Sequence, residues 1–471
     1  MIWDFLKYQD RAALIDDQNS ILTYGELEAF SHRLYKAVGG RTLLFILCTN
    51  SIGSAAGYAS CIHRGVVPAL LSAGTDAVLL ERLMEMYEPS YLWCPQGHML
   101  TSKYQSVFEE KGYCLLDTGY SKHCCMYSEL ALLLTTSGST GSPKFVRQSY
   151  RNIRSNAVSI AEYLQIDMDE RPISTLPMNY TYGLSIINSH LLKGAAIILT
   201  DAGLMQKKFW ELFRDQQATS FGGVPYTYEM LMKLRFFKMD LPSLRYMTQA
   251  GGKLSPELHK QFAEYALEHN RKFIVMYGQC EATARMAYLP ADKSLEKYGS
   301  MGIAIPGGMF RLIDLDGKEI FDANVAGELV YAGENVTLGY AEKKEDLVLG
   351  DERHGILETG DIAIRDKDGF YYIVGRKKRF LKVYGNRVNL DEIDLLLKEQ
   401  FQGMECASGG VDDQIYIFIT DNKFDSSSIR EFLENKTGLN KKAFTVMAID
   451  KLPQNDAGKI LYKELEKYYA E

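Results

Sequence analysis

The sequence predicts an α/β protein with a large N-terminal domain of doubly wound α/β subdomains, a small β-rich subdomain, and a small α+β C-terminal domain. Three observations support this fold class. Apolar strand-like runs alternate with helical segments up to about residue 310, short strands separated by turn residues follow, and a mixed helix-and-strand pattern completes the chain. We therefore place the two domains at 1–375 and 376–471, with the β-rich subdomain at about 308–375.

The first strands are short and apolar. They read RTLLFILC at 41–48, AAIILT at 195–200 and RKFIVMYG at 271–278. Because helical segments separate such runs, we expect the strands to pair in parallel.

Residues 308–375 have a different texture. MFRLIDLDGKEI, AGELVYAG and IAIRDKDGFYYIVG are short strand patterns. Asp-Gly pairs are typical of tight hairpin turns, so we expect turns at Asp316-Gly317 and Asp368-Gly369.

A basic segment, GRKKRFLKVYGNRVN at 375–389, follows this subdomain. Five of the seven residues from 376 to 382 are basic. Such a run is either a solvated turn or a swivel between domains that also attracts a phosphate-bearing partner. After it, DEIDLLLKEQ has a helical pattern and QIYIFIT a strand pattern, enough for a compact domain of roughly a hundred residues.

Composition excludes several classes of protein. The net charge is −7, whereas a general nucleic-acid binder has a basic footprint, so we expect no nucleic-acid partner. The eight cysteines include no CxxC pair, which favours reduced thiols in a cytoplasmic protein. No run of 18 apolar residues and no cationic N-terminal leader occurs, so we expect no membrane span.

The loop TTSGSTGSPK at 135–144 joins an apolar run, 131–134, to a segment for which Ser149 is a plausible helix N-cap. Its glycines, hydroxyls and lysine are suited to binding an anion between a strand and a helix. The alternative is a flexible surface linker. The loop fails the Walker pattern GxxxxGK, because the sixth position counted from Gly138 is Pro143 instead of glycine, and it also fails GxGxxG.

Several separated segments resemble one family, the adenylate-forming (AMP-binding) ligases, which include acyl-CoA synthetases and stand-alone adenylation enzymes. The matching segments, in family order, are TTSGSTGSPK at 135–144, YGQCEAT at 277–283, GELVYAGENVTLGY at 327–340, ETGD at 358–361, GRKKRFLKVYGNRVNLDEI at 375–393 and LPQNDAGKI at 452–460. Together they cover nearly the whole chain.

The resemblance implies a nucleotide site for ATP and Mg²⁺. Glu281 corresponds to the Mg²⁺ ligand, Tyr277 lies on or beside adenine, and Asp361 accepts from the ribose hydroxyls with help from Arg376. The other positions implied in nucleotide binding are Thr136, Ser137, Gly138, Ser139, Thr140, Gly141, Lys144, Gly251, Gly252, Gly278 and Cys280.

Two lysines carry the implied catalytic steps of the C-terminal domain. Lys459 corresponds to the lysine that bridges the attacking carboxylate and the α-phosphate. Lys378 corresponds to the hinge about which a mobile C-terminal domain rotates between the two half-reactions. The basic cluster Lys377, Lys378, Arg379 and Lys382 would then face the arriving pantetheine thiol.

The sequence departs from the family pattern at two positions. Cys280 replaces the usual threonine and offers a weaker donor near the α-phosphate. Tyr180, in PMNYTYG, stands where many relatives have histidine and where amino-acid-activating domains have aspartate, which favours an acid without an α-amino group. We interpret His190 as a structural histidine rather than a catalyst.

The resulting hypothesis is ATP-dependent activation of a small carboxylic acid to an acyl-adenylate, with catalytic roles for Lys459, Glu281, Lys378 and Tyr180. The acyl group would then pass to a thiol of CoA or of phosphopantetheine on a separate acyl or peptidyl carrier protein. Two alternatives stay open: an amino-acid adenylation enzyme that loads a carrier protein, and a catalytically inactive adenylate-binding protein.

Overall fold

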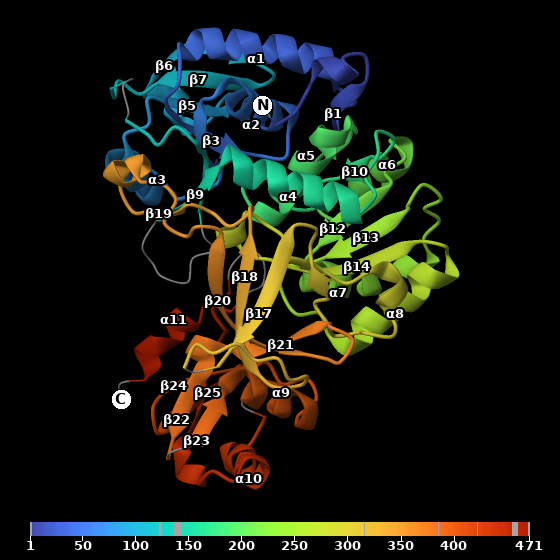
Figure 1. The fold of residues 1–471 in the computed structure, drawn as a ribbon, viewed down its shortest axis with the longest axis vertical. Coiled ribbons are helices and arrows are strands. Elements are labelled where there is room, and N and C mark those ends of the chain that lie inside the picture. The colour runs from blue at the N-terminus through green and yellow to red at the C-terminus, as the bar shows by residue number, and fades with distance from the viewer. Residues whose placement is uncertain are drawn as a thin grey trace. The chain divides into compact units, whose positions relative to one another are not determined.

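The computed structural model describes residues 2–121, 125–135, 144–314, 316–384, 386–421, 423–454 and 460–469 (Figure 1). These residues form two compact units. Unit 1 comprises the described residues up to 135, together with 144–309 and 331–357; unit 2 comprises those of 310–330 and from 358 onward. The domain boundary at residue 375 stays a prediction.

One sheet of unit 1 has nine strands in the described chain. Their spatial order is β16 (Ile303–Ala304), β15 (Ala287–Tyr288), β14 (Lys272–Tyr277), β13 (Tyr246–Gln249), β12 (Ser220–Gly223), β10 (Pro172–Ile173), β11 (Ile197–Leu199), β1 (Ala12–Asp16) and β2 (Ile21–Thr23). The strands from β1 to β14 pair in parallel, as expected for 195–200 and 271–278, and the edge strands pair antiparallel.

A second sheet, of eight strands among the described residues, completes the strand framework of unit 1. Its order is β19 (Gly339–Ala341), β9 (Phe145–Ser149), β8 (Leu130–Thr135), β4 (Val67–Ser72), β3 (Leu43–Cys48), β5 (Tyr91–Pro95), β7 (Tyr113–Asp117) and β6 (Gln105–Glu110). The parallel centre, β8-β4-β3-β5, contains the predicted strand 41–48.

The helices of unit 1 are α1 (Tyr24–Val38), α2 (Ile52–Arg64), α3 (Ala77–Tyr87), α4 (Tyr150–Tyr163), α5 (Thr181–Lys193), α6 (Lys207–Asp215), α7 (Pro225–Lys233) and α8 (Pro256–Glu268). Helices α2 and α5 are buried on every side over almost their whole length. A helix without a solvated face must lie in an interior. The two helices contact each other there through the Tyr58 hydroxyl, which donates to Asn188 Oδ1 at 2.8 Å.

The connection after β8 differs from the expectation. We expected the 135–144 loop to lead from a strand into a helix, but β9 comes first and pairs antiparallel with β8. Helix α4 starts only at Tyr150, with Ser149 as its N-cap: the Ser149 hydroxyl accepts from the Asn152 amide. The loop therefore joins two antiparallel strands, and the expectation that it leads from a strand directly into a helix is wrong.

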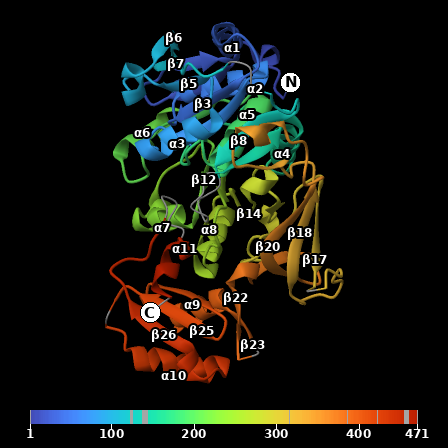
Figure 2. The ribbon, with the colours of Figure 1, turned by 90° about the vertical axis from the view of Figure 1, so that its left-hand side faces the viewer.

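Unit 2 includes most of a four-stranded sheet and a mixed C-terminal region (Figure 2). The sheet has the order β17 (Gly308–Ile313), β18 (Gly327–Gly333), β20 (Ile356–Arg365) and β21 (Tyr371–Arg376). β20 and β21 form the hairpin predicted at Asp368-Gly369, and the Gly317 amide closes the other predicted turn by donating to the Asp314 carbonyl.

The rest of unit 2 has its own core. It contains β22 (Phe380–Val383), β23 (Asn386–Asn389), α9 (Leu390–Gln400), β24 (Cys406–Val411), β25 (Gln414–Ile419), α10 (Ser426–Thr437), β26 (Phe444–Ala448) and α11 (Tyr462–Leu465). Alternate apolar residues of β25, Ile415, Ile417 and Ile419, pack with those of α9 and α10, so both helices cover the same face of this sheet. The helix predicted at 391–400 and the strand at 414–420 are confirmed.

No helix within the described ranges is long and apolar enough to cross a membrane.

Candidate active site

Glu281 lies in a short 3-10 helix, Cys280–Ala282, just beyond the carboxyl end of β14. Its Oε1 accepts a hydrogen bond of 2.7 Å from the Tyr340 hydroxyl. Burial, followed by the charge of Glu281, raises the pKa of Tyr340 to about 12, so this tyrosine is a proton donor at neutral pH. Tyr340 therefore fixes the position of the carboxylate.

Two cations lie against the same tyrosine. Lys144 Nζ is 3.7 Å from the centre of the Tyr340 ring, and the Arg353 guanidinium carbon is 4.8 Å from it. Arg353 Nη1 is buried and has no hydrogen-bond partner among the described residues. One carboxylate and two cations thus surround one ring, an arrangement suited to a polyphosphate and its divalent cation.

A strained turn follows Glu281 directly. Thr283 has φ 66° and ψ −53°, and the Ala284 amide donates to the Ala282 carbonyl at 2.7 Å. These values define a γ-turn with positive φ, a rare conformation that is more strained still for a β-branched residue. Such strain costs on the order of 1–3 kcal/mol and persists only where the surroundings hold it.

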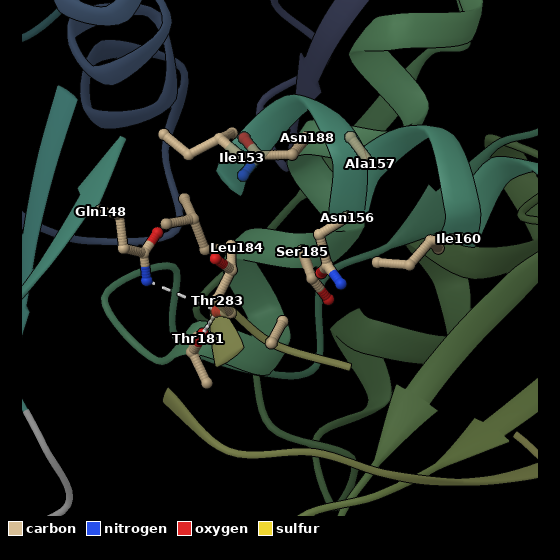
Figure 3. A pocket seen from close by; sticks show the side chains of 11 residues that line it. Gln148, Ile153, Asn156, Ala157, Ile160, Thr181, Leu184, Ser185, Asn188 and Thr283 are labelled. Atoms are coloured by element: carbon tan, nitrogen blue, oxygen red, sulfur yellow. Dashed lines mark hydrogen bonds between the residues drawn. The ribbon is translucent and has the colours of Figure 1, made fainter. Parts of the chain in front are cut away.

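Side chains from three segments hold this turn. The Thr283 carbonyl accepts from Thr181 Oγ1 and from Gln148 Nε2 (Figure 3). Thr283 Oγ1 donates to the Asn335 carbonyl at 2.7 Å, and Asn335 Nδ2 donates to the Ala282 carbonyl at 2.9 Å. These bonds fix the backbone on the C-terminal side of Glu281.

Gly278 lets the same segment fold back on itself. A Cβ at this position would lie 1.8 Å from the Ala284 carbonyl oxygen, so only glycine fits. The preceding Tyr277 is half-buried, and its hydroxyl accepts from Gln279 Nε2 at 3.1 Å. The Cys280 thiol lies 4.0 Å from the Thr135 carbonyl, at the start of the 135–144 loop. The structure therefore brings the YGQCEAT segment to the beginning of that loop.

Tyr180 and Gly251 also come together. Gly251 follows β13, has φ +83°, and a Cβ there would lie 2.6 Å from the Tyr180 hydroxyl. Burial and then the nearby Cys280 raise the pKa of Tyr180 to about 12. At neutral pH Tyr180 is thus a hydrogen-bond donor and not a base. Gly252 is exposed beside Gly251.

Parallel pairing places the segments after β13 and β14 at the same edge of the sheet. β13 pairs with β14, with Gln249 opposite Val275, so Gly251 and Tyr277 both follow carboxyl ends at one edge of the sheet. Ligands of open α/β sheets bind at this edge.

The polar cavity between α4 and α5 is not large enough for a substrate. It measures about 10 Å³ and is lined mainly by residues of these two helices, including Asn156, Thr181, Ser185 and Asn188 (Figure 3). This is room for about one water molecule. We assign it to the interior packing behind the Thr283 turn.

In unit 2, Asp361 and Arg376 face each other across the β20–β21 hairpin. Arg376 Nε is 3.0 Å from Asp361 Oδ1; Asp361 is 3% exposed and the Arg376 side chain 51%. The two side chains therefore form an ion pair, with the guanidinium on the solvent side.

The basic segment after Arg376 is only partly a basic surface. Lys377 Nζ is 2.6 Å from Glu328 Oε2, while Lys378 lies in a 3-10 helix, Lys377–Arg379, in which its side chain is not described. The expectation that Arg379 faces a ligand is wrong. Arg379 is buried and its nitrogens lie 2.6 Å from both Asp391 and Asp394.

Seven predicted site residues lie outside the described residues: Thr136, Ser137, Gly138, Ser139, Thr140, Gly141 and Lys459.

His190 is a structural residue, as predicted. It is 2% exposed; Nδ1 lies 2.8 Å from the Ile186 carbonyl and Nε2 3.1 Å from the Tyr246 hydroxyl. Burial, opposed by the bond to Ile186 and assisted by the charge of nearby Arg285, lowers the pKa of His190 from 6.5 to about 3.

This burial predicts a pH dependence of stability. Above pH 6.5 His190 is neutral in the folded and unfolded states and has no effect. Between pH 6.5 and about 3 only the unfolded state takes up the proton, so the free energy of unfolding falls with decreasing pH, by at most about 1.4 kcal/mol per pH unit from this group. We expect His190→Gln to make the decline between pH 6.5 and 4 shallower in urea unfolding curves; identical slopes would contradict the assignment.

A single carboxylate is a sufficient protein contribution to a magnesium nucleotide. Among the described residues no group of three acidic, histidine or cysteine side chains could hold a metal ion alone. Mg²⁺ in nucleotide sites is bound through one or two carboxylates plus substrate phosphates, and Glu281 fits that donor set.

A family model described as "AMP-binding enzyme" matches residues 3–341, more than half of the chain. The chain belongs to this family.

Relatives in the family include the oxalate–CoA ligase of Saccharomyces cerevisiae, which is 26% identical over 356 residues, covering 73% of this chain and 64% of the relative. The sulfoacetate–CoA ligase of Cupriavidus necator is 28% identical over 340 residues, covering 70% and 65%. The 2-succinylbenzoate–CoA ligase of Bacillus cytotoxicus is 27% identical over 431 residues, covering 86% of both chains. The match thus spans less than two thirds of the length of the first two relatives.

Solved structures of AMP-binding relatives establish the fold. The o-succinylbenzoate CoA synthetase of Bacillus subtilis in complex with its acyl-adenylate intermediate has a TM-score of 0.77 at 22% identity, covering 98% of this chain and 97% of that one. ATP-bound MatB of Rhodopseudomonas palustris has a TM-score of 0.76 at 21% identity, covering 99% and 98%. The predicted α/β fold class, with its large N-terminal domain and small C-terminal α+β region, is confirmed.

The sequence analysis did not single out three charged or hydroxyl residues near the candidate site: Tyr340, Arg353 and Arg285. Tyr340 ends the GELVYAGENVTLGY segment, so its place in a motif was a usable signal. Arg353 had no signal, because its position depends on a ring contact between distant segments. Arg285, a lone cation in EATARMAYL, could have been noticed as a charge inside an otherwise apolar stretch.

Proposed function

We propose that this protein joins a small carboxylic acid to the adenylyl group of MgATP, releases pyrophosphate, and then transfers the acyl group to the thiol of CoA. The observation that carries the proposal is the Glu281–Tyr340–Lys144 arrangement: a carboxylate fixed by a tyrosine, with a cation on the same ring, at the end of the 135–144 loop. Family membership supports it, since the relatives above are named as CoA ligases.

Each residue of unit 1 has a defined task in this scheme. Glu281 binds the Mg²⁺ of the nucleotide, and the cation neutralises charge on the departing pyrophosphate. Lys144 stabilises the phosphates that remain negative after Mg²⁺ binds. Tyr180, which is protonated, donates to the substrate carboxylate or the α-phosphate, while the Cys280 thiol provides at most a weak donor there.

The backbone after β13 and β14 binds the rest of the nucleotide. Gly251 and Gly252 leave one edge free of side chains, so the adenine can lie against the backbone beside Tyr277. Thr136 to Gly141 are proposed to bind the β- and γ-phosphates.

Residues of unit 2 have proposed roles of their own. Asp361 accepts from the ribose hydroxyls, and Arg376 holds that carboxylate in place. Lys459 bridges the acid and the α-phosphate, and Lys378 is the hinge for the thioester step. The domain boundary at 375–376 belongs to the same proposal, because rotation about Lys378 moves the residues after it as a body.

The thiol acceptor separates this proposal from its alternatives. We favour CoA because the relatives are named as CoA ligases. A carrier protein remains the second acceptor to test, in which case the enzyme would load phosphopantetheine on a separate chain.

Acid-dependent exchange of labelled pyrophosphate into ATP tests the first half-reaction. We expect exchange with Mg²⁺ and one class of carboxylic acid, no exchange with EDTA, and CoA thioester formation with the same acid. Exchange without thioester formation on CoA would point to a carrier protein. Nucleotide binding without exchange for any amino, aryl, short-chain or long-chain acid would favour an inactive adenylate-binding protein.

A further inference from the structure

Arg285 is a buried cation close to the proposed acid site. It is 2% exposed and lies four residues after Glu281, beyond the strained Thr283 turn. Its Nε donates to Ser185 Oγ at 3.1 Å, and Nη1 donates to the Tyr163 hydroxyl at 3.1 Å and contacts Met276 Sδ at 3.2 Å. These partners orient the guanidinium, but all of them are uncharged.

The other arginines that the structure describes as buried have carboxylate partners. Arg147, which is fully buried, pairs with Glu352, and Arg379 pairs with Asp391 and Asp394. Among the residues that the structure describes, Arg285 has no carboxylate within ion-pair distance, and its Nη2 makes no hydrogen bond. A buried charge is rarely left without a partner of opposite sign, so the missing anion needs an explanation.

The groups around Arg285 supply no negative charge at neutral pH. It influences Tyr163, Tyr182, Tyr246 and His190, and burial raises the pKa of each tyrosine and lowers that of the histidine, which keeps all four neutral. The nearby acid Glu170 is already bound by Arg245, at 3.1 Å, and by Thr219. No internal group therefore compensates Arg285.

Aromatic contacts connect Arg285 to the proposed acid site. Its guanidinium carbon lies 5.1 Å from the centre of the Tyr182 ring, and the Tyr180 ring lies 6.4 Å from that of Tyr182 in an edge-on arrangement. Tyr180 in turn approaches Gly251 and Cys280. Ring contacts thus form a continuous chain from Tyr180 through Tyr182 to Arg285.

We propose that the acid activated by this enzyme carries a second anionic group, a carboxylate or an anion of similar shape, which binds Arg285. This inference deepens the proposed function and rests on it. A planar guanidinium with a free nitrogen matches the two oxygens of a carboxylate.

Matched acid pairs test this assignment in wild-type enzyme. Glutarate and valerate, adipate and hexanoate, and terephthalate and 4-methylbenzoate differ only in whether the far end is a carboxylate or a methyl group. We expect pyrophosphate exchange to favour the dianionic member of at least one pair by about 100-fold in kcat/KM. A preference for the methyl member in every pair would overturn the inference while leaving the proposed function intact.

Substitutions at Arg285 identify the residue responsible. Arg285→Met should abolish the preference by raising KM for the diacid, with exchange of the methyl acids unchanged or increased, and Arg285→Lys should keep part of it. Arg271→Met is the matched control, because Arg271 also contacts a tyrosine ring, donates to Tyr265 and the Leu241 carbonyl, and has no carboxylate partner among the described residues. Equal loss of exchange for both members of each pair in Arg285→Met, with Arg285→Lys no better, would make Arg285 a structural residue and overturn the inference.

Thermal unfolding separates this inference from the proposed chemistry. Glutarate, adipate or terephthalate with MgATP should raise the Tm of wild type but not of Arg285→Met. That result without any pyrophosphate exchange would support an anion site in a protein whose proposed catalysis is wrong. Neither exchange nor a Tm shift with any of the six acids would overturn both.

Discussion

Glu281→Gln is expected to lower acid-dependent pyrophosphate exchange on the order of 10²–10³-fold. The amide has the size of the carboxylate and can still accept from the Tyr340 hydroxyl, so the fold around the Thr283 turn is kept. What is lost is the charge that binds Mg²⁺. We expect the deficit to be largest at low Mg²⁺, measured as exchange rate against Mg²⁺ concentration.

Tyr340→Phe is the companion variant, because it leaves the Glu281 charge in place and removes only its donor. A hydrogen bond to a charged group contributes about 1.5–3 kcal/mol, so at this half-buried site we expect roughly a tenfold loss, mainly in the KM for MgATP. Full exchange activity in Glu281→Gln would remove Glu281 from the metal site, and a greater loss in Tyr340→Phe would make the tyrosine the more important group.

Lys459→Ala is expected to lower acyl-adenylate formation on the order of 10²–10³-fold while sparing thioester formation from a supplied acyl-adenylate and CoA. The reason is that Lys459 is proposed to stabilise charge where the carboxylate attacks the α-phosphate, a step that the second half-reaction does not contain. Pyrophosphate exchange measures the first step, and release of AMP from synthetic acyl-adenylate with CoA measures the second.

Lys451→Ala serves as the control, since Lys451 is an exposed lysine of the same C-terminal segment. It should leave both half-reactions unchanged. An equal loss of the two half-reactions in Lys459→Ala would contradict separate use of the C-terminal domain in each step.

Apolar runs made much of the fold predictable. The strands at 41–48 and 195–200 are continuous apolar segments, and they became central parallel strands β3 and β11 because such segments can be buried on both faces. The helix cap at Ser149 was also readable, because a hydroxyl side chain next to an apolar helical pattern has one common use.

Buried polar residues account for the two structural predictions that were wrong, the strand-to-helix loop and the exposed Arg379. β9 contains Arg147 and Gln148, both buried, and so lacks the alternating pattern of a strand. Arg147 is tolerated there because Glu352 reaches it from 205 residues away. Arg379 was taken for a surface cation for the same reason, since its partners on α9 cannot be identified from charge spacing alone.

In the candidate site, too, some residues could be predicted from the sequence and others could not. Glu281, Gly278 and Asp361 could be named from the sequence because they lie in segments that resemble motifs of the family. Tyr340 and Arg285 matter through contacts with distant segments, and a single sequence contains no record of those contacts.

Hydrogen bonds from distant segments hold the turn at Thr283 in place. Its bonds come from Thr181, Gln148 and Asn335, and they reach the backbone on both sides, including the Arg285 carbonyl, which accepts from Asn156 Nδ2 at 2.8 Å. The Arg285 side chain makes none of these hydrogen bonds. Position 285 can therefore be varied while the main chain that carries Glu281 keeps its conformation. A small library of variants at positions 285, 163 and 185 should yield enzymes with new acid preferences and an undisturbed adenylation step.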